Sequence, residues 1–112
     1  MAYTSRLLYE NLRSLDTAGA AAYTALGTPL ANQGTLIKMV NLSNKNLLIS
    51  VDGTNDVDIC PANGFWLYDV TSDSTIQSSI FTDKGRQYYV KTSDAAAGTG
   101  LVYLVVQYIK TN

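Results

Sequence analysis

The residues in this sequence that could do chemistry are concentrated in one short acidic segment. Asp52, Asp56 and Asp58 lie close together around Asn55, and carboxylate and amide oxygens are ligands for Ca²⁺. Their order differs from that of an EF-hand loop, in which a glycine follows the third oxygen ligand. A pair of carboxylates could also serve a glycoside hydrolase, but the sequence indicates no cleft around such a pair. We interpret the segment as a solvated turn, with a calcium site in that turn as the alternative.

The sequence offers little else for catalysis. It contains no histidine, so it lacks the commonest general base and cannot form a Ser–His–Asp or Cys–His site. Its one cysteine, Cys60, precedes Pro61 among apolar neighbours, where we expect a small buried side chain and not a nucleophile. A single cysteine cannot form an internal disulfide, and zinc would need more ligands. We predict no catalytic residue, no cofactor and no metal, and expect that the protein is not an enzyme.

Four aromatic residues lie on predicted strands: Trp66, Tyr68, Tyr88 and Tyr89. An exposed row of such rings could stack on sugars, which would make the protein a carbohydrate-binding module. The alternative is packing in the core and across the sheet, because aromatic residues are enriched in strands in any case. We favour packing and keep carbohydrate binding as a second class of function.

Composition and charge argue against several classes of partner. The 112 residues carry a formal net charge of −1, only 15% of them are charged, and lysine and arginine do not cluster. Nucleic-acid binding needs a basic stripe that displaces counterions from phosphate, so we expect no nucleic acid as a partner. We expect no membrane contact either, since there is no basic amphipathic helix and no apolar stretch long enough for a bilayer. The N-terminal residues do not resemble a signal peptide, which indicates synthesis in a cytosol.

From residue 34 onward the chain has the pattern of an all-β protein. Short strands alternate with turns rich in Gly, Asn, Asp and Pro, which is typical of a sandwich or barrel. No connection is long enough for a crossover helix, so we predict an antiparallel jelly-roll-like β-sandwich of about eight strands. The predicted strands are 35–42, 47–52, 57–60, 65–70, 76–81, 87–91 and 101–109.

Residues 1–33 are compatible with more than one structure. Residues 5–12 could begin a short helix, and residues 18–26 combine an alanine-rich run with features of a strand. We divide the chain into an N-terminal arm, residues 1–15, and a β-sandwich domain, residues 16–112. The arm is too apolar for a free tail, so it either contacts a partner or packs on its own sandwich as an extra strand. Its apolar residues are Tyr3, Leu7, Leu8, Tyr9 and Leu12.

The last predicted strand, 101–109, is apolar on both faces. A half-buried strand should alternate with polar residues, so this strand is either covered on both sides or presents its outer face to another subunit. We therefore add Tyr103 and Tyr108 to the apolar residues of the arm as candidate protein-interface residues.

Period-2 placement of apolar residues also predicts the core of the sandwich. We further predict that Gly53, which follows Asp52 in a tight turn, adopts a positive φ. The predicted core residues are Ile37, Met39, Leu47, Ile49, Val51, Leu67, Val90, Val102, Leu104 and Val106.

Several short segments follow one another in the order of a hairpin, a turn and a closing strand. The segments are 23–30 (YTALGTPL), 40–44 (VNLSN), 48–56 (LISVDGTND), 61–65 (PANGF), 67–70 (LYDV), 84–85 (KG), 89–91 (YVK) and 100–103 (GLVY). Together they resemble a group of small virion structural proteins of tailed bacteriophages. The chain departs from that pattern at Asn63 and Gly64, where a simpler small-residue turn is expected.

The resemblance implies a β-sandwich that is placed repeatedly on a virus particle. Within that group, the sequence is most similar to capsid cement or decoration proteins, which stabilise the shell by contacts between subunits. A component of the head–tail neck or of the tail is the alternative. The partners implied are the protein's own copies and major capsid or neck proteins, and the implied location is the virion, assembled in the cytoplasm of a bacterial host.

Overall fold

The computed structural model describes residues 5–69 and 84–111, so Tyr3 and the predicted strand 76–81 lie outside the described residues. In the described part of the chain, no helix has the length and hydropathy needed to cross a membrane. The elements are β1 (Ser5–Tyr9), β2 (Arg13–Asp16), the 3₁₀ helix η1 (Thr17–Gly19), β3 (Thr24–Ala25), β4 (Leu36–Asn41), β5 (Leu47–Ser50), β6 (Asp58–Cys60), β7 (Gly64–Asp69), β8 (Tyr89–Thr92) and β9 (Leu101–Thr111).

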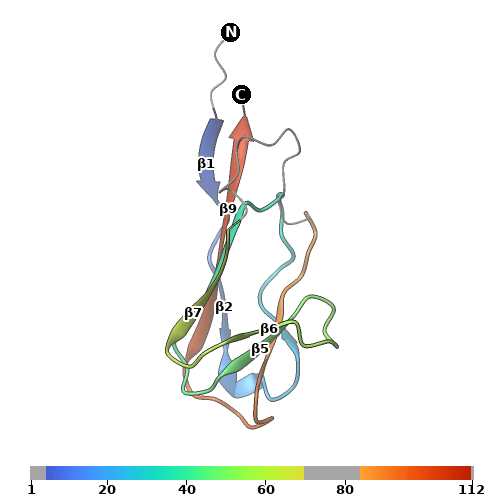
Figure 1. The fold of residues 1–112 in the computed structure, drawn as a ribbon, viewed down its shortest axis with the longest axis vertical. Helices are drawn as coiled ribbons and strands as arrows, with labels where there is room; N and C mark the ends of the chain where they lie inside the picture. The colour runs from blue at the N-terminus through green and yellow to red at the C-terminus, as the bar shows by residue number, and fades with distance from the viewer. Residues whose placement is uncertain (1–4, 70–83, 112) are drawn as a thin grey trace.

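These strands form the antiparallel β-sandwich that the sequence predicts. A five-stranded sheet has the order β1-β9-β4-β7, with β2 also paired to β9, and a four-stranded sheet has the order β3-β8-β5-β6. All the pairs are antiparallel. Figure 1 shows β9 running through much of the length of the molecule, with β5 and β6 in the other layer. The long last strand therefore organises the larger sheet.

Strand pairing is nested along the chain. β5 pairs with β6, β4 with β7, β3 with β8, and β2 with β9. Strands adjacent in sequence form the innermost pair, and strands further apart in sequence enclose them. The first and last described strands are consequently paired, with Ser5 of β1 opposite Thr111 of β9.

The core lies between the two sheets, where alternate residues of each strand point inward. Most of the predicted core is confirmed, and Val51 is partly buried against it. Leu26, Leu30, Cys60 and Tyr88 are further buried members from the loops and strand ends. The predicted residues that are buried are Ile37, Met39, Leu47, Ile49, Val90, Val102, Leu104 and Val106.

The assignment of Leu67 to the core is wrong. Leu67 is 48% exposed, whereas its neighbour Trp66 packs against the core. Directly opposed residues of antiparallel strands share a face; Trp66 lies opposite the buried Met39, and Leu67 lies opposite Lys38. The run from Phe65 to Tyr68 is apolar throughout, so its alternation does not indicate which residues point inward.

The N-terminal segment forms strands of the five-stranded sheet. Residues 5–9 pair with residues 107–111 of β9, and residues 13–16 pair with residues 101–104 of the same strand. A short helix over residues 5–12 is therefore wrong, and residues 18–26 contain only the end of η1 and the short strand β3. Within the described part of the arm, residues 5–9 and 13–15 are thus strands of the protein's own sandwich.

A β-bulge joins β1 to β2. The backbone N–H of Glu10 donates to the carbonyl of Val106 at 3.0 Å, and Arg13 lies opposite Leu104, so residues 11–12 together face Val105. A bulge inserts one extra residue into one strand and bends it. In a regular strand Glu10 and Arg13 would point to opposite faces, but here both side chains are buried on the same side, 6% and 7% exposed.

Truncation of Leu104 should be far more costly than truncation of Leu67. Leu104 is 1% exposed within the core, and Leu→Ala at such a site destabilises by about 2–5 kcal/mol through lost burial and the cavity left behind. Leu67→Ala, on the outer face, should change the free energy of unfolding by less than about 0.5 kcal/mol. Denaturant unfolding followed by circular dichroism measures both values. Equal costs at the two positions would contradict the strand faces described above.

Candidate interaction surface

The acidic segment of the sequence is a self-capped turn. Oδ1 of Asp52 accepts hydrogen bonds from the backbone N–H groups of Thr54 and Asn55, both at 2.8 Å, and from the Ser50 hydroxyl at 2.8 Å. The bonds from the Asn55 and Thr54 backbone, followed by those from Ser50 and the Asn55 side chain, hold the pKa of Asp52 well below its usual range. The predicted positive φ of Gly53 is confirmed at 80°.

The other two aspartates are engaged elsewhere. The Tyr23 hydroxyl donates to Asp56 Oδ1, and Lys91 Nζ lies 3.6 Å from the same oxygen. Burial, followed by the bond to Asp56, raises the pKa of Tyr23. The indole N–H of Trp66 donates to Asp58 Oδ2 at 2.6 Å. Across the described ranges, no three His, Cys, Asp or Glu side chains are grouped as metal ligands would be, so the geometry favours the turn over the calcium alternative.

The thiol of Cys60 is poorly suited to nucleophilic chemistry. The residue is fully buried at the end of β6, and burial raises the pKa of the thiol to about 11. A nucleophilic cysteine needs a large thiolate fraction near neutral pH. Cys60 is thus a member of the core cluster, in the position that the sequence predicts.

The four aromatic residues do not form one exposed row. Tyr88 is buried, Trp66 and Tyr89 are half-buried, and Tyr68 is the most exposed of the four. Trp66 stacks on Tyr68 with ring centroids 6.3 Å apart and packs at a tilt against Tyr88 at 6.0 Å. These contacts correspond to the packing alternative.

The outer face of the five-stranded sheet carries part of the predicted interface. Leu7 and Tyr9 are 52% and 60% exposed; Tyr9 lies opposite Gln107 and Tyr103 opposite Val40, so these side chains share the outer face. Leu8 and Tyr108 are half-buried on the opposite side. Leu12 is exposed within the bulge.

Strand β7 adds apolar residues to this face that the sequence analysis missed. Phe65 is 63% exposed and lies opposite Val40, which is itself opposite Tyr103 on β9. Leu67 belongs to the next row across the sheet. Leu42, at the end of β4, is also exposed and donates its N–H to the carbonyl of the exposed Leu101. We call this set the outer face: Leu7, Tyr9, Val40, Leu42, Phe65, Leu67, Leu101, Tyr103 and Val105.

One charged residue lies in the middle of the outer face. Lys38 is half-buried between Leu67 of β7 and Val105 of β9, which lie opposite it on either side. Within residues 5–69 and 84–111, no ion pair or hydrogen bond of its side chain is found. The outer face is thus an apolar surface with a central ammonium group that has no carboxylate partner in the described structure.

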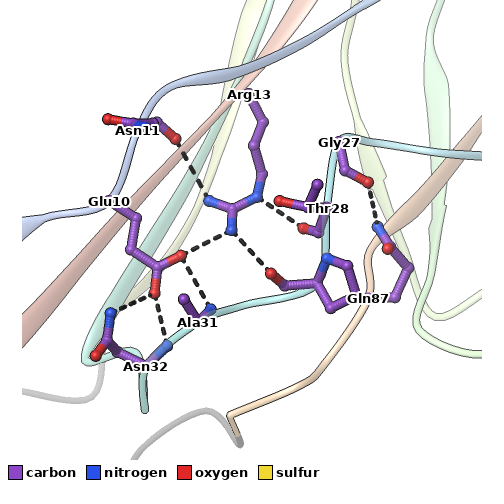
Figure 2. A network of polar contacts seen from close by, with 9 residues as sticks. Glu10, Asn11, Arg13, Gly27, Thr28, Ala31, Asn32 and Gln87 are labelled. Atoms are coloured by element: carbon purple, nitrogen blue, oxygen red, sulfur yellow. Dashed lines mark hydrogen bonds and ion pairs between the residues drawn. The ribbon is translucent and has the colours of Figure 1, made fainter.

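A buried polar network fixes the edge of this sheet, as Figure 2 shows. Arg13 donates to Glu10 Oε1 at 2.7 Å and to the carbonyls of Thr28 at 2.7 Å and Pro29 at 3.0 Å. Glu10 accepts from the backbone N–H and side chain of Asn32 at 2.8 and 3.0 Å. Burial alone would raise the pKa of Glu10, but the bonds from Arg13 and Asn32 and from the Ala31 N–H lower it overall. The network fastens residues 27–32 to the bulge between β1 and β2.

The chain matches no protein-family model, no curated protein and no solved structure. Its function is therefore inferred from its surfaces and from the sequence resemblance.

Replacement of Gly53 should destabilise the turn that Asp52 caps. Gly53 has φ of 80°, and an L-residue held in that region costs about 1–2 kcal/mol. Gly19→Ala is the matched control, since Gly19 has no positive φ and an added Cβ meets no atom within 4 Å. Thermal and urea unfolding should show a loss of stability for Gly53→Ala beyond that of Gly19→Ala. Equal stabilities would exclude the left-handed turn.

The buried Glu10–Arg13 pair should make stability depend on pH. Because the folded pKa of Glu10 is lowered from 4.5, its contribution is full above that pH and is lost as pH falls through the folded pKa. Glu10→Gln leaves Arg13 buried without its counter-charge, which should cost about 3 kcal/mol at pH 7. Urea unfolding of both proteins from pH 7 to pH 2.5 measures the difference, which should shrink in acid. A difference that stays constant with pH would contradict this role.

Proposed function

We propose that this protein is a non-enzymatic structural subunit of a bacteriophage virion that docks on neighbouring subunits through the outer face. The observation that carries the proposal is the apolar character of that face, on which Phe65, Leu67, Leu42 and Leu101 are exposed beside Leu7 and Tyr9. A large contiguous patch of exposed apolar residues is rare on a monomeric protein and commonly marks a binding site.

The composition of the outer face supports a protein as its partner. Interface cores are depleted in charged residues and enriched in aromatic ones. Phe65, Tyr103 and Tyr9 supply large rigid rings on three strands, and Lys38 is the charged residue among them. An open sheet face with such side chains fits another protein surface better than it fits a small molecule.

Among virion positions, the resemblance favours the capsid shell, where the protein would act as a cement or decoration protein. The nested strand pairing supports the jelly-roll-like topology that we predict for it. Shell subunits offer many equivalent sites, so modest contacts by each copy sum to a large gain in particle stability. A place in the neck or the tail is the alternative within the same class.

The charge on the outer face specifies the chemistry of the partner. Lys38 is half-buried in apolar surroundings, and covering it would leave a desolvated ammonium group unless a carboxylate met it. The subunit surface that fits is therefore apolar with an aspartate or glutamate opposite Lys38. Electrostatic pairing of this kind gives register and specificity more than raw affinity.

Binding to purified phage particles tests the proposal. The protein should cosediment with empty heads of the phage that encodes it, and Leu67→Ser should weaken this binding about fivefold or more, the effect of truncating a well-packed interface residue. Ile59→Ser is the matched control, because Ile59 is 46% exposed on the other sheet. Binding to tails alone would move the protein to the alternative position. Binding to neither particle, or equal binding by both variants, contradicts the proposal.

Charge variants at Lys38 test the carboxylate. Lys38→Glu should abolish cosedimentation, and Lys38→Met, which keeps the length of the side chain, should weaken it. Lys84→Glu is the control for net charge, since Lys84 is exposed in a loop outside the outer face. Stronger binding by Lys38→Met would show that the partner surface carries no carboxylate at this point.

A further inference from the structure

Among the described strands, the end of the five-stranded sheet that carries β1 consists of β1 and the end of β9. The last pair between β4 and β9 is Leu36 opposite Gln107, so residues 108–111 of β9 have β1 as their one strand neighbour among the described residues. Figure 1 shows β1 and the end of β9 side by side. The radius of gyration of 15.1 Å exceeds the value of about 13 Å for a compact chain of this length, as a protruding pair of strands would require.

Such a pair of strands is poorly stabilised on its own. An isolated pair of strands is marginal in water and needs further strands or packing. Here Leu7 and Tyr9 are exposed on one face, and Leu8 and Tyr108 are half-buried on the other. An additional strand or packed element beside β1 and the end of β9 would therefore stabilise them.

The backbone of β1 offers a free edge for that neighbour. The N–H of Glu10 points to β9, where it donates to Val106. Backbone groups of an antiparallel strand alternate in direction, so those of Arg6 and Leu8 also point to β9, and those of Ser5, Leu7 and Tyr9 point away from it. No strand pairs with them in the part of the chain that the structure describes. Proline and β-bulges are two of the devices that protect edge strands, and residues 5–9 contain neither.

We propose that β1 pairs antiparallel with β1 of a second copy of this protein across a two-fold axis at Leu7. Among the described residues, the outward backbone groups of β1 are those of Ser5, Leu7 and Tyr9, and a register centred on Leu7 uses all three. Leu7 then pairs with Leu7 of the second copy, and Ser5 with Tyr9.

Across the two-fold axis, two copies of this edge are complementary to each other. An unrelated strand would need its own matching pattern. Opposed residues share a face, so the outer faces of both copies lie on the same side of one continuous sheet. Pairing would thus present two outer faces to a shell as a single surface.

Sedimentation velocity of the full chain over a concentration series tests the pairing, with charge variants at the axis. Leu7→Lys and Leu7→Glu each place like charges opposite one another in a homodimer, and both keep the backbone bonds to β9. Each variant should sediment as a monomer at concentrations where the wild type is a dimer. An equal mixture of the two should recover the dimer, since Lys then faces Glu.

Amide hydrogen exchange locates the contact. In the dimer the amides of Leu7 and Tyr9 should be at least tenfold more protected than in the Leu7→Lys variant, while the amide of Leu8 is protected in both. A wild type that stays monomeric, variants that dimerise alone, or a mixture that does not recover dimers would overturn the proposal. A dimer that Leu67→Ser dissociates and Leu7→Lys does not would also overturn it, since that dimer uses the outer face.

Discussion

The pairing of β9 with three other strands is the constraint on which the rest of the sandwich depends. β9 meets β4 along one side and both β1 and β2 along the other, so its inward residues Val102, Leu104 and Val106 must all be apolar. Its length of eleven residues, against six for β4, leaves its end paired with β1 alone among the described strands. The bulge between β1 and β2 follows from the same pairing, because it keeps Arg13 and Leu15 on the inner side while both strands stay paired with β9.

Most of the sandwich could be predicted because period-2 alternation and turn chemistry are local signals. Asp52 and Gly53 predict the turn from residue types within residues 52–56. In β4 and β9 the inward residues occupy every second position. Residues 5–13 were the difficult part because Glu10 and Arg13 have the spacing of an ion pair on a helix. In the structure the bulge brings them together on a strand, and the partners that satisfy them come from residues 27–32. No local pattern reports a bulge that long-range pairing with β9 creates.

The interaction surface could be predicted only in part, for a related reason. Two apolar faces on the last strand indicated an outer surface, and Tyr103 lies on it. The same double-faced pattern occurs in β7 from Phe65 to Tyr68, where it predicts Leu67 as a core residue although Leu67 faces outward. β7 and β9 both belong to the five-stranded sheet, and β4 lies between them. The outer apolar surface therefore extends across β4. A strand without polar alternation therefore signals a covered or docking face wherever it occurs, and the register with its neighbours decides which side is outward.

Among the described strands, those at the edges of the two sheets differ in how readily they could pair with another strand. β3 has two residues and β6 has three, and such short edges give little template for pairing. β7 is longer, but it lies beside β6, to which the Trp66–Asp58 hydrogen bond connects it. β1 has a regular five-residue backbone and extends beyond the layer that contains the core. An edge strand of this kind is a hazard for a free monomer and an advantage for a subunit that works in an array, because the same unpaired backbone groups that promote aggregation supply a defined contact when symmetry fixes their partner.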